Sequence, residues 1–227
     1  MKKFMTLMVS AALVLTFSQG ASAQLGGLMK KGGTDKSADA SSSDSSSGSA
    51  AGEKPSAETI EKDLKQIIVV TSRALSAFNE ALGMKEQAAK AASNADCLEK
   101  GQCGVADAVA VVQSAQEATK VAVEGMKSEG KKLSADASKK AVAALVPAIQ
   151  GIPLWKRVID GGKALQSDRM AMMKAGALVK ALPKVPGAMQ GTFATFDAGL
   201  SYLSFSGVDG KTLDPLKADL AKSMKGI

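Results

Sequence analysis

The chain has 227 residues, with 29 Lys and Arg against 22 Asp and Glu, and its formal net charge is +7. It contains no His, so the usual general base near neutral pH and the commonest metal ligand are both missing. Its two Cys form no Cys-x-x-Cys-His motif, which excludes a c-type haem attachment. A zinc or c-type haem site is therefore not expected. Carboxylate chemistry, a Ser-Lys pair or a Mg or Ca site of Asp and Glu would still be open to this composition, but the sequence has no constellation for any of them. We predict no metal, no cofactor and no enzymatic activity.

The first 23 residues have the three parts of a secretory signal peptide. Lys2 and Lys3 give a positive start, residues 4–17 form an apolar run, and residues 21–23 read Ala-Ser-Ala, a small-x-small cleavage site. The run is shorter than the roughly 20 apolar residues that a membrane span needs. We predict cleavage near Ala23, no transmembrane span, and a mature protein that is periplasmic or secreted.

Residues 24–54 have the composition of a low-complexity linker. They are mostly Gly, Ser, Ala, Asp and Lys, with almost no apolar side chain after Met29. Such a segment buries too little apolar surface to offset the entropy lost on ordering its backbone. We predict that it is disordered, either as a spacer for the domain that follows or as a tolerated tail.

Residues 55–227 have the composition of an all-α domain. Apolar residues make up 45% of the chain, and many of them are Ala, the best helix former, while aromatic residues make up only 4%. The sequence lacks the alternating β-branched segments that mark strands. The length is normal for one domain. We predict an antiparallel helical bundle of about five to six helices.

The clearest amphipathic helix begins at Ser56, because Ser is a residue type that caps helix N-termini. Its apolar residues recur at spacings of three and four. We expect Gly83 to kink or end this helix, and residues 85–96 to continue helical with a supporting Glu86–Lys90 pair. The apolar stripe comprises Ile60, Leu64, Ile67, Ile68, Thr71, Leu75, Phe78 and Leu82.

The two cysteines, Cys97 and Cys103, are separated by five residues. Disulfides persist in exported proteins, so we predict that the two are bonded. A catalytic redox pair is the alternative, although such pairs are more often Cys-x-x-Cys. Residues 105–126 form a second amphipathic helix, which we expect to pair antiparallel with the first, the disulfide holding the tip of the hairpin.

Gly and Pro divide the next part of the chain into shorter predicted helices. Ser134 opens a helix that Pro147 kinks or Gly151 ends. Pro153 begins another, which the Gly161-Gly162 pair interrupts.

The last third of the chain predicts three further helices. Residues 163–182 form a Met- and Ala-rich helix with apolar residues on nearly all sides, which indicates a central position. Pro183 and Pro186 stop that helix. Residues 190–205 form the next one, and Asp214-Pro215 caps a final short helix that reaches about Met224.

Charge is distributed unevenly along the predicted domain. Residues 55–130 hold 8 basic and 11 acidic residues, whereas residues 131–227 hold 15 basic and 7 acidic residues. A basic surface attracts anionic lipid or other polyanions, and a Trp beside two cations suits a membrane interface. In the alternative interpretation, Trp155 fills the core and the cations form a solvated face that also meets the acidic hairpin. The candidates for an anion-binding surface are Lys139, Lys140, Trp155, Lys156, Arg157, Arg169, Lys174, Lys180 and Lys184.

Methionine and aromatic residues are concentrated in the same C-terminal part. Between packed helices such side chains line adaptable ligand pockets, but more often they form the core. The candidates for an apolar pocket are Met170, Met172, Met173, Met189, Phe193, Phe196, Tyr202 and Phe205.

These features predict an exported, non-enzymatic helical-bundle protein of the bacterial cell envelope that acts as an interaction or scaffold module. Its partners would be anionic lipid, lipopolysaccharide or another envelope protein, with no specific nucleic acid, and exposed Ala-rich faces would also permit self-association. The alternative is a periplasmic carrier or sensor that holds a small apolar ligand between the Met- and Phe-rich helices. A large internal cavity would favour the carrier, and a filled core with a basic face would favour the interaction module.

Overall fold

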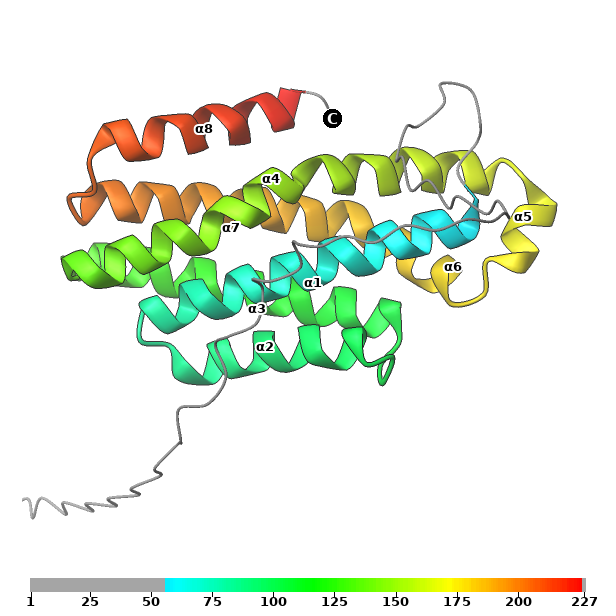
Figure 1. Cartoon of the computed structure of the whole chain (residues 1–227), viewed down its shortest axis with the longest axis horizontal. Helices are drawn as coiled ribbons and strands as arrows, with labels where there is room; N and C mark the ends of the chain where they lie inside the picture. Colours follow the sequence, from blue (N-terminus) through cyan, green and yellow to red (C-terminus); the bar gives the residue numbers. More distant parts are fainter. Residues whose placement is uncertain (1–55, 226–227) are drawn as a thin grey trace, which may run out of the picture. The chain divides into compact units, whose positions relative to one another are not determined.

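The computed structural model describes residues 56–225, and each of its secondary-structure elements is helical (Figure 1). The prediction of an all-α fold is therefore confirmed for these residues. The predicted signal peptide, residues 1–23, the whole of the predicted linker, residues 24–54, and the first residue of the predicted domain, Pro55, lie outside them.

Six helices of 15 residues or more make up most of the described chain. Two short α-helices and a 3-10 turn connect the fourth long helix to the fifth. In chain order the elements are α1 (Ala57–Ala81), α2 (Lys85–Glu99), α3 (Val105–Ser128), α4 (Ala135–Gln166), α5 (Arg169–Lys174), α6 (Ala177–Ala181), η1 (Leu182–Lys184), α7 (Val185–Phe205) and α8 (Gly210–Lys225).

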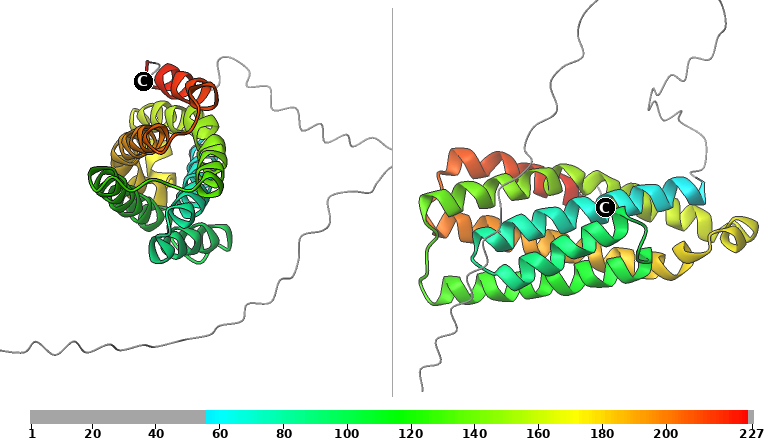
Figure 2. Two further views of the ribbon diagram at one scale, coloured as in Figure 1. Left: turned by 90° about the vertical axis from the view of Figure 1, so that its left-hand side faces the viewer. Right: turned by 60° about the horizontal axis from the view of Figure 1, so that its bottom comes forward.

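Four long helices, α1, α4, α7 and α3, surround the core in that order, because each packs on the next and α3 packs back on α1. Helix α2 covers α1 and α3 from outside, and α8 covers α4 and α7 from the other side (Figure 2). The largest fully buried side chains include Phe78, Trp155, Phe196 and Tyr202. The core thus contains most of the few aromatic residues of the chain.

Helix α1 starts and ends where the sequence predicts. The Ser56 hydroxyl accepts a hydrogen bond from the Thr59 backbone N–H at 3.2 Å, which caps the helix. Gly83 adopts a φ of 78°, a left-handed conformation that ends helices. The chain reverses there, so α2 returns antiparallel along α1, and its predicted Glu86–Lys90 ion pair forms at 2.7 Å.

The predicted antiparallel pairing of the first and second amphipathic helices is wrong. Because the chain reverses at Gly83 and again after α2, α3 runs in the same direction as α1 (Figure 1). Helix α3 is also parallel to α7: Gln113 donates to the Lys184 carbonyl at 3.1 Å, and further along Lys127 donates to Ser201 at 2.9 Å. The antiparallel partner of α3 is α2.

Helix α4 is a single helix of 32 residues, so the predicted breaks at Pro147, Gly151, Pro153 and Gly161-Gly162 are wrong. Both prolines lie on the exposed side, where water can hydrate the carbonyl groups left without a donor. The glycines permit close packing: a Cβ at Gly151 would lie 2.9 Å from Ile67, and one at Gly162 would lie 2.7 Å from Leu182.

The single central helix predicted over residues 163–182 is also wrong. Helix α4 ends at Gln166, and Asp168 caps α5, accepting hydrogen bonds from the backbone N–H groups of Met170 and Ala171 at 3.0 and 3.1 Å. Gly176 has a φ of 47° and separates α5 from α6. The segment lies at one end of the helical domain, and α5 has no buried residue.

The C-terminal helices start earlier than predicted. Pro183 lies in the 3-10 turn and Pro186 in the first turn of α7, a position where its missing N–H costs nothing. Helix α8 starts at Gly210, so Pro215 lies inside it.

Helix α4 is long and apolar enough to cross a membrane by length and composition alone, and 39% of its most apolar window is buried among the other helices. Core helices of soluble proteins pass the same test. The absence of a transmembrane span therefore stays a prediction from sequence.

Candidate functional site

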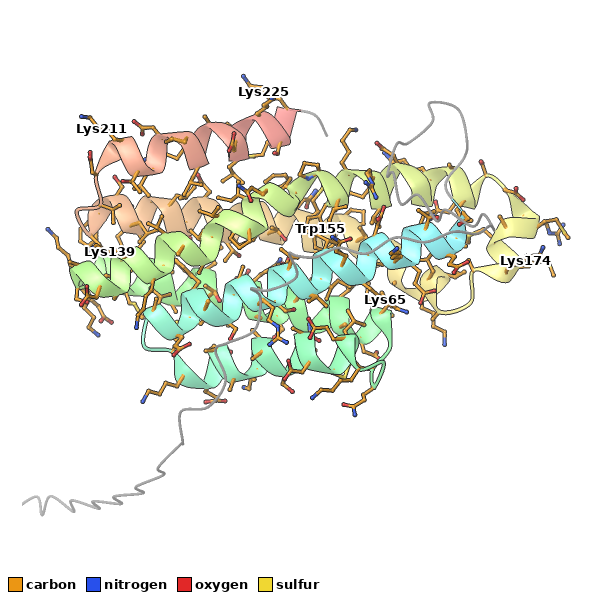
Figure 3. The ribbon with its side chains drawn as sticks, in the orientation of Figure 1. Lys65, Lys139, Trp155, Lys174, Lys211 and Lys225 are labelled. Carbon is orange, nitrogen blue, oxygen red and sulfur yellow. A yellow bond between two sulfur atoms is a disulfide. The ribbon has the colours of Figure 1, made fainter. Side chains whose placement is uncertain are left out.

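The structure separates the predicted anion-binding residues into three groups. Lys139 and Lys140 lie in the first turns of α4, at one end of the helical domain, while Lys174 lies at the other end (Figure 3). Lys156 and Arg157 lie between these ends, on α4. The group at the far end of the domain comprises Arg169, Lys174, Lys180 and Lys184.

The middle group is neutralised by acids. Lys156 pairs with Asp160 at 3.0 Å, and Arg157 donates through Nε and its terminal nitrogen to Asp63 on α1. Asp63 is only 9% exposed, so this ion pair holds α4 on α1. Arg157 thus serves the fold, and both cations offer little free charge to a partner.

Trp155 is fully buried, with 0% exposure, and belongs to no surface of this structure. It occupies the core side of α4, one position before the exposed Lys156. The alternative interpretation, in which this Trp fills the core, is the one that the structure supports.

The end of the domain that carries α5 and α6 combines cations with exposed methionines. We call it the basic tip and define it by Lys163, Arg169, Met170, Met173, Lys174, Lys180 and Lys184, all of them exposed. Met170 is 67% exposed and Met173 is 77% exposed. Methionine side chains of this exposure are exceptional in a domain that buries most of its large apolar residues.

The charge of the basic tip is nearly uncompensated along its own segment. Residues 163–184 hold five basic residues and one acid, Asp168, whose carboxylate caps α5. Glu61 in the second turn of α1, which starts at this end, pairs with Lys65 at 2.7 Å. By contrast, the lysines of α8 alternate with Asp214 and Asp219. Residues 163–184 thus carry a net charge of +4, five cations less one acid, at one end of the domain.

The predicted apolar-pocket residues do not come together. Met189, Phe193, Phe196 and Tyr202 are buried in the core, and Phe205 is half-buried. Helix α5, at the domain end, carries the other three: Met172 is half-buried there, and Met170 and Met173 point to solvent. These side chains fill the core or cover the tip and do not line one pocket.

A groove of about 1130 Å³ lies elsewhere, on the seam of α1 and α4 beside the start of α2. Its floor is apolar and built from small side chains, among them Val70, Ala77, Ala81, Ala143 and Pro147. Sequence reasoning missed it because alanines outside an amphipathic stripe carry no signal of their own. The pairing of α1 with α4 creates the groove, and only the fold shows that pairing.

Charged residues mark the rim of this α1–α4 groove. Arg73 donates to Glu99 at 2.9 Å and also pairs with Asp96, which joins α1 to α2. The hydrogen bond that Arg73 donates to Glu99, together with the hydrogen bond to Asp96 and the charges of both acids, outweighs the effect of burial and raises the pKa of Arg73 above its ordinary value. Arg73 therefore stays charged and engaged, and the groove has no free cation at that point.

Cys97 lies in α2, and Cys103 lies just before α3. Their Cα atoms are 5.5 Å apart, a separation that a disulfide spans. In residues 56–225 there is no cluster of three or more Cys, Asp and Glu that would hold a metal ion.

The chain matches no protein-family model, no curated protein and no solved structure.

Proposed function

We propose that the chain is an exported, non-enzymatic helical-bundle module of the bacterial cell envelope, and that its basic tip contacts anionic envelope components. The observation that carries the proposal is the local charge: five exposed cations against one acid, which is itself engaged as a helix cap. Phospholipid headgroups and lipopolysaccharide are the polyanions that an exported bacterial protein meets.

The structure narrows the earlier set of candidate residues. Lys156 and Arg157 are paired, and Trp155 is buried, so the proposal depends on Arg169, Lys174 and their neighbours. Arg169 and Lys174 project from α5, whose first turn is capped by Asp168. The aromatic residues of the bundle are mostly buried. A filled core with charge at its surface fits an interaction module better than a carrier.

A pair of charge-reversed variants tests this function. The mature chain should bind lipopolysaccharide or anionic vesicles more tightly than neutral vesicles, and added salt should weaken the binding. Reversal of three tip cations, R169E/K174E/K180E, should abolish it. K211E/K217E/K222E on α8 changes the charge equally and should retain most of it. Equal binding to neutral and anionic surfaces, or equal loss in both variants, would contradict the proposal.

A disulfide between Cys97 and Cys103 is part of the proposal, since it would fix the α2–α3 turn in an oxidising compartment. The mature protein purified from the periplasm should have a mass two hydrogen atoms below that of the reduced chain and should resist alkylation until a reductant is added. Replacing both residues by Ser should cost about 2 kcal/mol of unfolding free energy. Two free thiols in the purified protein would refute the bond.

The α1–α4 groove favours a second candidate function, the binding of an apolar ligand on the protein surface. Its volume of about 1130 Å³ slightly exceeds the usual range of ligand pockets, which reaches about 1,000 Å³. The fluorescence of a hydrophobic probe such as N-phenylnaphthylamine should rise with the wild type and not with A143W, which fills the groove. A89W, on the exposed face of α2, is the matched control. No fluorescence change with the wild type would end this candidate.

A further inference from the structure

We propose that the basic tip docks on the surface of an anionic phospholipid bilayer by inserting Met170 and Met173 between the headgroups while the surrounding cations bind phosphate. This inference rests on the proposed function and specifies its partner and its contact residues. The domain would sit end-on at the membrane, with its long helices pointing away from it.

Helix α5 packs on the domain with one side only, which leaves the two methionines on its other side available for insertion. Ala171 and Met172 are half-buried against the core, whereas Met170 and Met173 are mostly exposed. The helix therefore presents one face to the domain and the other to solvent. Two unbranched, polarizable side chains on the solvent face can adapt to the irregular headgroup region.

The cations of the basic tip complement an anionic headgroup layer. Arg169 and Lys174 bracket the two methionines at the ends of α5, and Lys180 follows on α6. Asp168 keeps its negative charge, but its carboxylate is directed at two backbone N–H groups of α5, and the five cations of residues 163–184 outnumber it. Cations around an exposed apolar pair are the pattern of interfacial membrane contacts, whereas a soluble acidic protein would need no inserted methionines.

The position of α5 permits such a contact without rearrangement of the bundle. The turn that carries it projects at the end of the domain, beyond the packed helices (Figure 2). The Asp168 cap and the left-handed Gly176 fix the two ends of the turn. The remaining long helices keep their packing while the tip is in the headgroup layer.

Vesicle binding with matched variants tests the inference. The mature chain should co-sediment with phosphatidylcholine vesicles that contain phosphatidylglycerol and not with pure phosphatidylcholine. M170S/M173S should weaken binding about tenfold, because it removes the inserted apolar surface. M224S alters an exposed methionine on α8 and should change binding less than about twofold. R169Q/K174Q should weaken binding at least about tenfold.

A fluorescence measurement separates insertion from charge attraction. Trp introduced as M173W should shift its emission to the blue on anionic vesicles, whereas M224W should not, and the buried Trp155 gives a constant background. Salt-dependent binding without the blue shift and without loss in M170S/M173S would overturn the insertion and leave the proposed function standing. Wild-type protein that binds neither anionic vesicles nor lipopolysaccharide would overturn both.

Discussion

At the scale of the residue, the roles of Tyr202 and Asp63 depend on their burial and on the hydrogen bonds that they form across the fold. Tyr202 is 1% exposed, and its hydroxyl donates a hydrogen bond to the Lys131 carbonyl at 3.0 Å. Asp63, 9% exposed, takes two hydrogen bonds from Arg157. Each of these contacts links segments that are distant in the chain, the first joining α7 to the α3–α4 connection and the second joining α4 to α1, so neither was visible in the helical periodicity.

Titration of Tyr202 should report its burial. Burial raises the pKa of this phenol above 10.0, and the hydrogen bond from Ser206 and the charge of Lys131 oppose only part of the effect. The neutral phenol is therefore favoured in the folded state. Its contribution to stability should be complete below about pH 10 and lost as the pH rises through the folded-state pKa.

Because the chain has a single Tyr, the ultraviolet absorbance of the phenolate measures this group alone. The midpoint should be higher in the folded protein than in denaturant. Identical midpoints in the two solvents would show that the phenol is not buried.

The Asp63–Arg157 pair should matter more for stability than its neighbour on the same helix. R157Q removes the charged partner of a nearly buried carboxylate, so it should lower the unfolding free energy by about 1–2 kcal/mol. K156Q breaks an ion pair between exposed side chains and should cost less than about 0.5 kcal/mol. Chemical denaturation of both variants gives the comparison, and equal losses would contradict the assigned role of Asp63.

At the scale of the element, the sequence predicted what depends on local chemistry. The stripe from Ile60 to Phe78 gave α1 its length and its buried face, and Ser56 and Gly83 gave its ends. The prediction from sequence was wrong for α4, where Pro and Gly were interpreted as helix breaks. Whether a helix tolerates Gly151 or Gly162 depends on Ile67 and Leu182, which only the tertiary fold places opposite them.

Two glycines within helices should respond oppositely to Ala. A Cβ at Gly125 in α3 would meet nothing within 4 Å, so G125A should gain about 0.5–1 kcal/mol from helix propensity. At Gly162 the added Cβ would lie 2.7 Å from Leu182, which is 6% exposed and packed, so G162A should lower stability. Thermal or urea unfolding checks both, and a gain at Gly162 would show that the glycine is not required for close packing.

At the scale of the whole molecule, composition predicted the fold class and missed the arrangement. High Ala content and few aromatic residues fixed an all-α domain, but the parallel run of α1 and α3 follows from the reversals at either end of α2. For the candidate site, too, the sequence predicted one part and the fold decided the other. The excess of C-terminal cations was visible in the sequence, whereas the neutralisation of Arg157 and the exposure of Met173 depend on contacts across the bundle.

The packing of α4 determines how the whole protein can contact a membrane. Helix α4 is apolar enough to span a bilayer, yet its apolar face packs on α1, α7 and α8, and Lys156, Arg157 and Asp160 lie in its C-terminal half. Insertion would require giving up the Asp63–Arg157 pair and much of the core. We therefore expect contact through the basic tip only, so that alkaline carbonate releases the mature protein from membranes. The liberated chain should begin near Gln24, as N-terminal sequencing would show. Retention in the carbonate pellet would indicate an integral span and contradict the peripheral tip, and an N-terminus at Met1 would contradict the leader cleavage.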